Sequence, residues 1–235
     1  MKLSILQTGD VPQALRPRFG SYAAMFQRMF DATAAGLSYE VAPVSNGAPF
    51  PDLDGVEAIL VTGSPAGVYD VLPWIEPLRD YIRRAYGRRT PMLGICFGHQ
   101  IMADALGGTV RKSDRGWGIG RHSYEVLARP SFMNGAPAQL AISCSHQDQV
   151  ITAPGESQTI LASPFTPHAG LTYRNGAALS LQPHPEFTDD YALALAELRQ
   201  DVAHDDVVAA ARASFAAPSD SRQVAGYLTR FLVAR

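Results

Sequence analysis

A cysteine set between two glycines is the residue of this sequence best suited to covalent chemistry. The order is Gly94-Ile95-Cys96-Phe97-Gly98, with a short apolar run at 91–95 and a helix-like stretch at 100–106. A strand that turns sharply into a helix exposes a nucleophile at the turn. The glycines let strand and helix approach closely, and the positive end of the helix favours the attacking thiolate. A buried structural cysteine is the alternative, but the glycine spacing favours a catalytic one.

A second motif contains an acid–base pair for such a thiol. Pro183-His184-Pro185-Glu186 follows an apolar run at 177–182. The proline after His184 biases this histidine toward extended backbone, and residues two apart in extended chain point the same way. Glu186 can then accept a hydrogen bond from the imidazole, so that His184 takes the thiol proton and passes it to a leaving amine. The alternative is a turn histidine beside a surface glutamate, but a place at a strand's carboxyl end favours catalysis.

A glycine turn after another buried strand is a candidate oxyanion hole. Gly63 and Ser64 follow the apolar run at 58–62. Acyl transfer needs N–H donors where the tetrahedral intermediate becomes negative. We expect one donor from Ser64 or Gly63 and the other from Phe97, the residue after the nucleophile. An ordinary strand-to-loop turn is the alternative if Cys96 is not catalytic.

The remaining histidines do not form a metal-binding pattern. His146 and Asp148 are close in sequence, but no further ligand follows at a spacing typical of zinc. His99 falls on the helix after Cys96 and is expected to be structural. His122, His168 and His204 lie in polar or loop-like stretches. We therefore expect no metal and no cofactor.

Apolar runs that alternate with helix-like stretches must position these motifs. This alternation predicts an α/β fold, a mostly parallel central sheet with helices on both faces. From about 121 to 182 the chain is strand-rich, which predicts an antiparallel extension that includes the buried strand 177–182. The expected earlier strands are 3–7, 39–44, 58–62 and 91–95, and the expected helices are 21–30, 77–86 and 100–106. We expect a single domain over 1–235, with a core at 1–187 and a helical C-terminal appendage at 188–235, interrupted near Pro218.

Composition and charge exclude several function classes. The 235 residues carry a net charge of −2, which leaves no footprint for nucleic acid or an anionic membrane surface. No apolar stretch approaches the roughly 20 residues that span a bilayer. Two cysteines do not make a disulfide framework in a chain this long, and the first apolar run is too short for a signal peptide. These features predict a cytoplasmic location.

Together these motifs resemble the class I glutamine amidotransferases, most of all stand-alone members similar to the glutaminase domain of GMP synthase and to γ-glutamyl peptidases. The resemblance covers residues 1 to about 187. It implies a flavodoxin-like architecture, a Cys96–His184–Glu186 triad and an oxyanion loop at Gly63-Ser64-Pro65. It also implies that substrate is held by Gly63, Gln100, Ser145, His146, Gln147 and Asp148.

Two departures from the family pattern bear on function. Ser64 stands where the family often has a second glycine. The Ser-Gly-Gly-x-Asp-Ser loop of the ATP pyrophosphatase domain of GMP synthase does not occur, nor does a Gly-Lys-Ser/Thr phosphate loop. The chain is therefore not expected to activate an acceptor with ATP by itself.

The resemblance implies that Cys96 attacks the γ-amide of glutamine or another γ-glutamyl compound and releases glutamate with ammonia or an amine. Either the protein stands alone, or it is a glutaminase subunit that supplies ammonia to a separate synthase partner. The helical region after 187 could cap the site, which favours the first version. A non-catalytic γ-glutamyl-binding regulatory module and another kind of cysteine hydrolase are further alternatives. Trp117 is expected either to border the cleft or to pack within its own loop.

Overall fold

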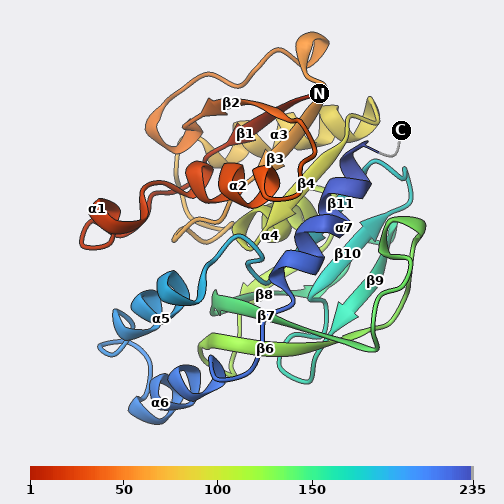
Figure 1. Cartoon of the computed structure of the whole chain (residues 1–235). Coiled ribbons are helices and arrows are strands. Elements are labelled where there is room, and N and C mark those ends of the chain that lie inside the picture. The colour runs from red at the N-terminus through yellow and green to blue at the C-terminus, as the bar shows by residue number, and fades with distance from the viewer. Residues whose placement is uncertain (234–235) are drawn as a thin grey trace.

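Nine strands form one mixed sheet in the computed structural model, which describes residues 1–233 (Figure 1). They are β1 Lys2–Leu6, β2 Ser38–Ala42, β3 Ala58–Val61, β4 Met92–Ile95, β6 Gly118–Val126, β7 Gln139–His146, β9 Ser157–Ala162, β10 Gly170–Tyr173 and β11 Ala178–Leu181. Their order is β2-β1-β3-β4-β11-β10-β9-β6-β7. In this sheet order, the neighbours from β2 to β11 pair in parallel, and the neighbours from β11 to β7 pair antiparallel. The predicted parallel centre with an antiparallel extension is confirmed.

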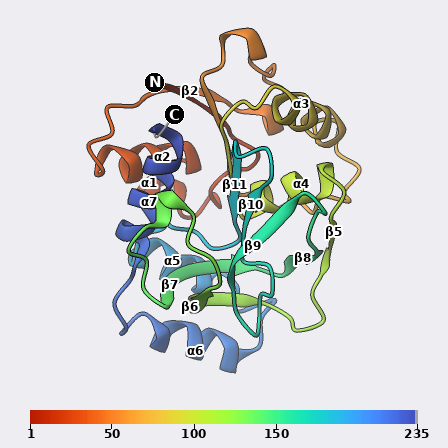
Figure 2. The same ribbon diagram turned by 90° about the vertical axis from the view of Figure 1, so that its right-hand side faces the viewer.

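Helices cover both faces of the sheet. Figure 2 shows α3 (Ile75–Gly87) and α4 (Phe97–Ala105) on one side, and α2 (Tyr22–Asp31) and α7 (Ser221–Val233) on the other. In α3 the buried residues Leu78, Ile82 and Ala85 recur at helical spacing, so one apolar stripe faces the strands. Two apolar cores result, one under α2 and α7 and the other under α3 and α4. The remaining helices are α1 Arg16–Phe19, α5 Asp189–Glu197 and α6 Asp205–Ser214, with single 3₁₀ turns at Val44–Asn46, Leu53–Gly55 and Ser131–Met133.

Strand β11 joins the two halves of the sheet. It pairs antiparallel with β10 but parallel with β4, in the register Leu181↔Ile95. The sequence analysis assigned this strand to the antiparallel extension, which is wrong for its pairing with β4. Because parallel strands end at the same edge, the residues that follow β11 lie beside those that follow β4.

Two elements near the site differ from the sequence-based expectation. Helix α4 begins at Phe97 rather than at residue 100, so that Cys96 is its N-cap residue. β5 (Thr109–Lys112) and β8 (Asp148–Thr152) form a separate two-stranded sheet. The sequence analysis did not expect a strand at β5. The short run 109–112 mixes Thr, Val, Arg and Lys, and only Val110 is buried. Such a strand has little apolar pattern of its own because most of its side chains are not buried.

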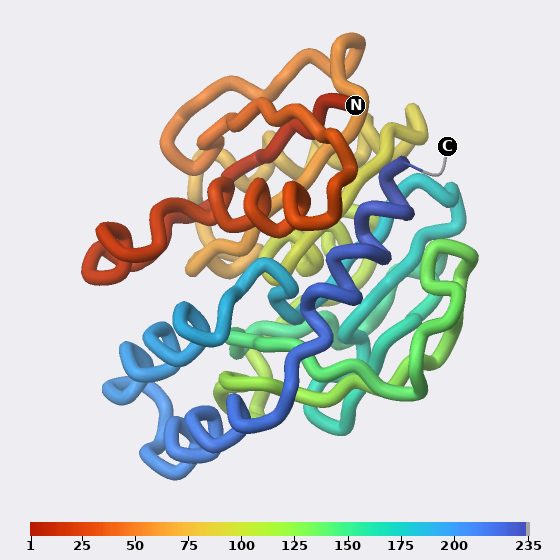
Figure 3. Tube along the Cα trace, in the orientation of Figure 1, coloured from red at the N-terminus to blue at the C-terminus, as the bar shows by residue number. Residues whose placement is uncertain are grey.

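The chain after β11 first runs past the antiparallel strands and then returns to the parallel half of the sheet. Helices α5 and α6 pack beside β7 and β6, and α7 then returns to lie along α2, as the tube in Figure 3 shows. Val224, Leu228 and Phe231 of α7 are buried in the same core as strand β1. The division of the chain at residue 187 stays a prediction. In the part of the chain that the structure describes, no helix is long and apolar enough to cross a bilayer.

Candidate active site

Cys96 lies at a strained turn between β4 and α4. Its backbone has φ 54° and ψ −105°, a conformation that non-glycine residues rarely adopt and that clusters at functional sites. The turn is held by two hydrogen bonds, from Cys96 N to Leu181 O (2.8 Å) and from Gln100 N to Cys96 O (3.0 Å). The side chain is 6% exposed and reaches two surface hollows. The predicted strand–turn–helix arrangement is therefore present around this thiol.

The two glycines that flank Cys96 are required by close packing. A Cβ on Gly98 would lie 2.1 Å from the carbonyl oxygen of Val61, and a Cβ on Gly94 would lie 2.5 Å from the carbonyl oxygen of Gly98. Gly98 N also donates to Thr62 O (3.1 Å), which ties α4 to the end of β3. Only residues without a side chain let β3, β4 and α4 approach so closely.

Two backbone segments lie close to Cys96, the first turn of α4 and the turn at Gly63. Phe97 is the first residue of α4, and an N–H in a first helical turn has no acceptor within the helix. Gly63 lies against the site from the other side, because a Cβ on it would be 3.1 Å from Cε1 of His184 and 3.7 Å from Cβ of Cys96. The hydroxyl of Ser64 accepts from Ala66 N (3.2 Å) within its own loop.

Gly9 is part of this arrangement and was not found from the sequence. A Cβ on Gly9 would lie 2.9 Å from Cα of Ser64 and 2.8 Å from Cδ of Pro65. The loop after β1 therefore supports the Gly63-Ser64-Pro65 loop directly. A glycine shortly after the first strand was the available signal, but nothing local indicated which loop it would contact.

His184 and Glu186 follow β11 and face each other. The Nδ1–H of His184 donates to Oε1 of Glu186 (2.7 Å), and the imidazole stacks on Phe187 at a ring-centroid distance of 3.9 Å. The backbone differs from the expectation of extended chain, because Phe187 N donates to His184 O (3.4 Å) and closes a turn. His184 is itself anchored by donating from its backbone N to Ser143 O (2.8 Å). The predicted contact thus forms through a turn, in which Pro185 occupies a position that needs no N–H.

Neighbouring groups favour the protonated, positively charged form of His184. Burial lowers the pKa of this imidazole, but the negative charges of Glu186 and Cys96 and the hydrogen bonds to both outweigh burial and raise the pKa of His184 to about 10. His184 and Glu186 are 4% and 5% exposed, so little solvent screens the interaction. The imidazole of His184 is therefore charged at neutral pH beside Cys96.

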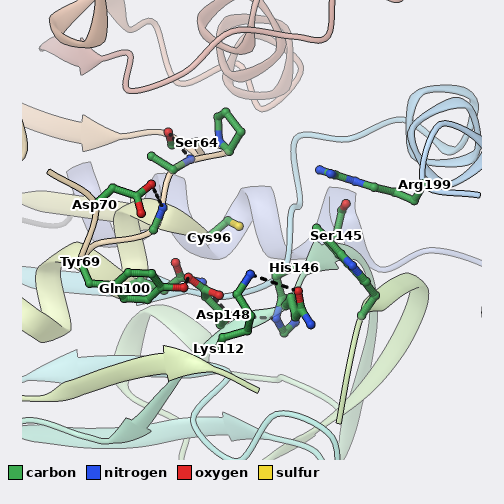
Figure 4. Close-up of a pocket in the computed structure, with 15 residues that line it drawn as sticks. Ser64, Tyr69, Asp70, Cys96, Gln100, Lys112, Ser145, His146, Asp148 and Arg199 are labelled. Atoms are coloured by element: carbon green, nitrogen blue, oxygen red, sulfur yellow. Dashed lines mark hydrogen bonds between the residues drawn. The ribbon is translucent and has the colours of Figure 1, made fainter. Parts of the chain in front are cut away.

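A polar hollow of about 300 Å³ opens on one side of Cys96 (Figure 4). The segment 145–148, where β7 ends and β8 begins, lines one wall of it, together with Gln100. Gln100 Nε2 donates to Asp148 O (2.8 Å) and so holds this segment in place. The Oγ of Ser145 is buried and has no hydrogen-bond partner among residues 1–233. The structure therefore brings Gln100, Ser145, His146, Gln147 and Asp148 together beside the thiol, and their binding roles stay predictions.

The buried histidines near the site are neutral. Burial lowers the pKa of His146 to about 3 and the pKa of His99 to about 3. Nδ1 of His99 lies 2.8 Å from Oγ of Ser180, within the layer between α4 and the sheet. Neither ring carries a charge that competes with His184 at neutral pH.

Three further side chains line the polar hollow and were missed by the sequence analysis. Tyr69 donates from its hydroxyl to Oδ2 of Asp148 (2.8 Å), and Lys112 donates to Oε1 of Gln147 (3.4 Å). Arg199 lines the hollow from the segment after α5 and packs over the ring of Trp117 at 4.3 Å. Trp117 also lines the hollow, one of the two places expected for it. Tyr69, Lys112 and Arg199 come from three separate segments, and no local motif marks them.

Residues 21–192 match the family model of the class-I glutamine amidotransferases, so the chain belongs to that family. It is 29% identical to γ-glutamyl peptidase 3 of Arabidopsis thaliana, over 75% of this chain and 73% of that protein. It is 30% identical to a glutamine-hydrolysing GMP synthase of Aeropyrum pernix, over 77% of this chain but only 34% of that protein. The crystal structure of a glutamine amidotransferase from Thermotoga maritima shares the fold, with a TM-score of 0.72, 20% identity and coverage of 100% and 96% of the two chains.

Proposed function

We propose that this protein hydrolyses the γ-amide bond of glutamine or another γ-glutamyl compound through a γ-glutamyl thioester. The observation that carries the proposal is the strained turn at Cys96, with the His184–Glu186 hydrogen bond of 2.7 Å beside it. A thiol, an imidazole and a carboxylate that orients the imidazole form the arrangement needed for acyl transfer to sulfur.

The first step forms the bond between sulfur and the γ-carbonyl carbon. The thiolate of Cys96 attacks, and the carbonyl oxygen takes the negative charge of the tetrahedral intermediate. The N–H of Phe97 and an N–H of the Gly63-Ser64 turn donate to this oxygen. The donors are backbone groups of packed segments, so they need little reorganisation when the charge develops.

The second step breaks the carbon–nitrogen bond. As the intermediate collapses, the imidazolium of His184 gives its proton to the departing nitrogen, which leaves as ammonia or an amine. The neutral imidazole then takes a proton from water, whose oxygen attacks the thioester carbon. Glutamate is released, the sulfur leaves as thiolate, and His184 is protonated again. Glu186 keeps the imidazole in one tautomer throughout.

The polar hollow fits the amino-acid end of the substrate. Asp148 and Asp70 supply carboxylates there, and Ser145 supplies a hydroxyl without a partner in the described chain. A γ-glutamyl group carries an ammonium and a carboxylate on its α-carbon, so it needs both acceptors and donors close together. We assign the binding of this end to Gln100 and the segment 145–148. Gly63, which the sequence analysis also placed at the substrate, does not line the polar hollow but lies beside Cys96.

The test is glutamate release by the purified chain alone. Glutamine and a panel of γ-glutamyl peptides are incubated with the wild-type protein, with Cys96→Ala and with Cys144→Ala as the matched control. We expect turnover by the wild type and by Cys144→Ala, and none by Cys96→Ala. Release that persists in Cys96→Ala would refute the proposed nucleophile.

A second candidate is a glutaminase subunit that works with a synthase partner. The loop beside the polar hollow exposes three large apolar side chains, Tyr69 at 51%, Val71 at 104% and Leu72 at 40%. Exposed apolar patches mark interaction sites. This candidate predicts that the isolated chain turns over no compound of the panel although Cys96 is still alkylated by a glutamine-like electrophile.

A further inference from the structure

A second hollow adjoins the first at Cys96 and has a volume of about 490 Å³. Five residues line both hollows and mark the boundary between them, namely Ser64, Pro65, Cys96, Ser145 and Arg199. His184 lines the second hollow and not the first. The proposed proton donor therefore stands on the side of the second hollow, which is where a departing nitrogen would need it.

The walls of the second hollow are largely apolar, in contrast to the first. They come from the loop after β1, from α2, from the turn after β11 and from the end of α5. The apolar side chains that line this hollow and not the first are Pro12, Tyr22, Phe187, Leu195 and Leu198. Covering the water-accessible part of such apolar surface with an apolar group of a ligand stabilises the complex. Ammonia offers no such group.

The volume of the second hollow is also much larger than a molecule of ammonia requires. A molecule of water, which is similar in size to ammonia, takes about 30 Å³ in the liquid. The hollow is more than ten times larger and falls within the range of about 300–1,000 Å³ that is typical of small-molecule sites. It can hold an amine with a substantial side chain.

Arg199 supplies a cation to this side of the site. Figure 4 shows its side chain extending from the segment after α5 toward Cys96. Its Nε is buried and lacks a hydrogen-bond partner, and no carboxylate within residues 1–233 pairs with the guanidinium. Asp10, the acidic residue that lines the same hollow, is instead engaged by Gln7 Nε2 (3.0 Å) and by Arg16 (3.5 Å). A partly buried guanidinium with free donors is suited to a carboxylate, which it can bind through two parallel hydrogen bonds.

We propose that the second hollow binds the leaving group, and that this group is an amino acid or short peptide with an apolar side chain whose carboxylate is held by Arg199. The inference rests on the proposed function and specifies its substrate class. The scissile nitrogen lies next to Cys96 and receives its proton from His184. The apolar side chain covers Leu195, Leu198 and Phe187, while the carboxylate reaches Arg199. Substrates of this class are γ-glutamyl amino acids and peptides rather than free glutamine.

The test compares two substrates that differ only in the leaving-group carboxylate, γ-glutamyl-phenylalanine and γ-glutamyl-phenethylamide. We expect the wild type to hydrolyse the first with a kcat/KM about 10- to 100-fold higher, as for one charge-assisted hydrogen-bonding pair. Arg199→Met should lower kcat/KM for γ-glutamyl-phenylalanine by that factor and leave the phenethylamide nearly unchanged. Arg199→Lys should restore part of the preference because it keeps the charge. Arg222→Met, which removes an exposed arginine of α7 that lines neither hollow, is the matched control.

Three results would overturn the inference. Equal losses on both substrates in Arg199→Met would place the arginine at the glutamyl end, which the two substrates share. If Arg199→Met kept the wild-type preference for γ-glutamyl-phenylalanine over the phenethylamide, Arg199 would not bind the carboxylate. A kcat/KM for glutamine as high as for γ-glutamyl-phenylalanine would show that the second hollow contributes nothing. In all three cases Cys96-dependent release of glutamate would persist, whereas loss of that release from every substrate would refute the proposed function as well.

Discussion

The two cysteines of this chain belong to the same sheet but lie in opposite settings. Cys96 follows the parallel strand β4, has φ 54° and lines both hollows. Cys144 lies inside the antiparallel strand β7, opposite Gly120 of β6, and its burial raises the pKa of its thiol to about 12. In the middle of a strand the backbone donors are used by the ladder and no helix begins there. At the end of a parallel strand, free N–H groups and a helix N-terminus meet the side chain. Although both thiols are buried, we therefore expect Cys96 to be the reactive one and Cys144 to be inert.

The largest expected effect comes from removing the thiol at the turn. Cys96→Ala should lower the rate of glutamate release by about 10⁴-fold or more, because the covalent step is lost. The measurement is glutamate production under saturating substrate. Residual activity of Cys96→Ala within tenfold of the wild type would contradict the assignment of Cys96, rather than Cys144, as the reactive thiol.

Loss of the imidazole should be the next largest effect. His184→Asn keeps a polar side chain but cannot carry the proton, and we expect a decrease in kcat of about 10²- to 10⁴-fold. A burst of amine without steady turnover would place the loss in thioester hydrolysis. An unchanged kcat would exclude His184 as the acid–base group.

Close packing at the turn can be tested through stability. A Cβ on Gly98 would lie 2.1 Å from the Val61 carbonyl oxygen, so Gly98→Ala should lower the free energy of unfolding by about 1–3 kcal/mol or more. Gly155→Ala is the control, because a Cβ on Gly155 meets nothing within 4 Å. Urea denaturation measures both variants. Equal stability of the two would mean that the turn does not depend on the missing side chain.

The charge balance around the thiol predicts a pH dependence. Burial lowers the pKa of His184, but Glu186 and Cys96 raise it to about 10, so the imidazolium persists through neutral pH and is lost as pH rises through about 10. The rate should therefore fall on the alkaline side near pH 10. Glu186→Gln removes one of the raising charges, so its alkaline limb should move to lower pH. A limb that stays in place would exclude Glu186 as a source of the shift.

The smallest effect is expected at the other cysteine. Cys144→Ala removes one buried sulfur from β7 and should cost about 1 kcal/mol of stability, with activity within about twofold of the wild type. Mass spectrometry after treatment with iodoacetamide should find the label at Cys96 in both proteins. Labelling of Cys144 in the folded wild type would show that its thiol is not inert.

Much of the fold could be predicted from local patterns. The apolar runs at 58–62 and 91–95 correspond to β3 and β4, whose residues are all buried, and continuous burial is typical of parallel strands covered on both faces. The parallel pairing of β11 with β4 could not be predicted, since it depends on how the antiparallel strands between them return the chain. The weak strand at 109–112 was missed because only one of its four residues is buried, so the sequence there shows no apolar run.

The sequence by itself determined the kind of site that this protein carries. Cys96 between glycines, the Gly63-Ser64 turn and the His184–Glu186 pair each end a strand, and short-range spacing is sufficient to recognise such motifs. Only the tertiary structure decided which side chains surround them. Arg199, Tyr69 and Lys112 lie on segments without a motif, and they meet Cys96 because packing of the whole sheet and its helices brings distant segments together. The second hollow, bounded by α5 and the loop after β1, exists only in the folded chain, since periodicity along a sequence encodes which face of an element is buried but not what covers it.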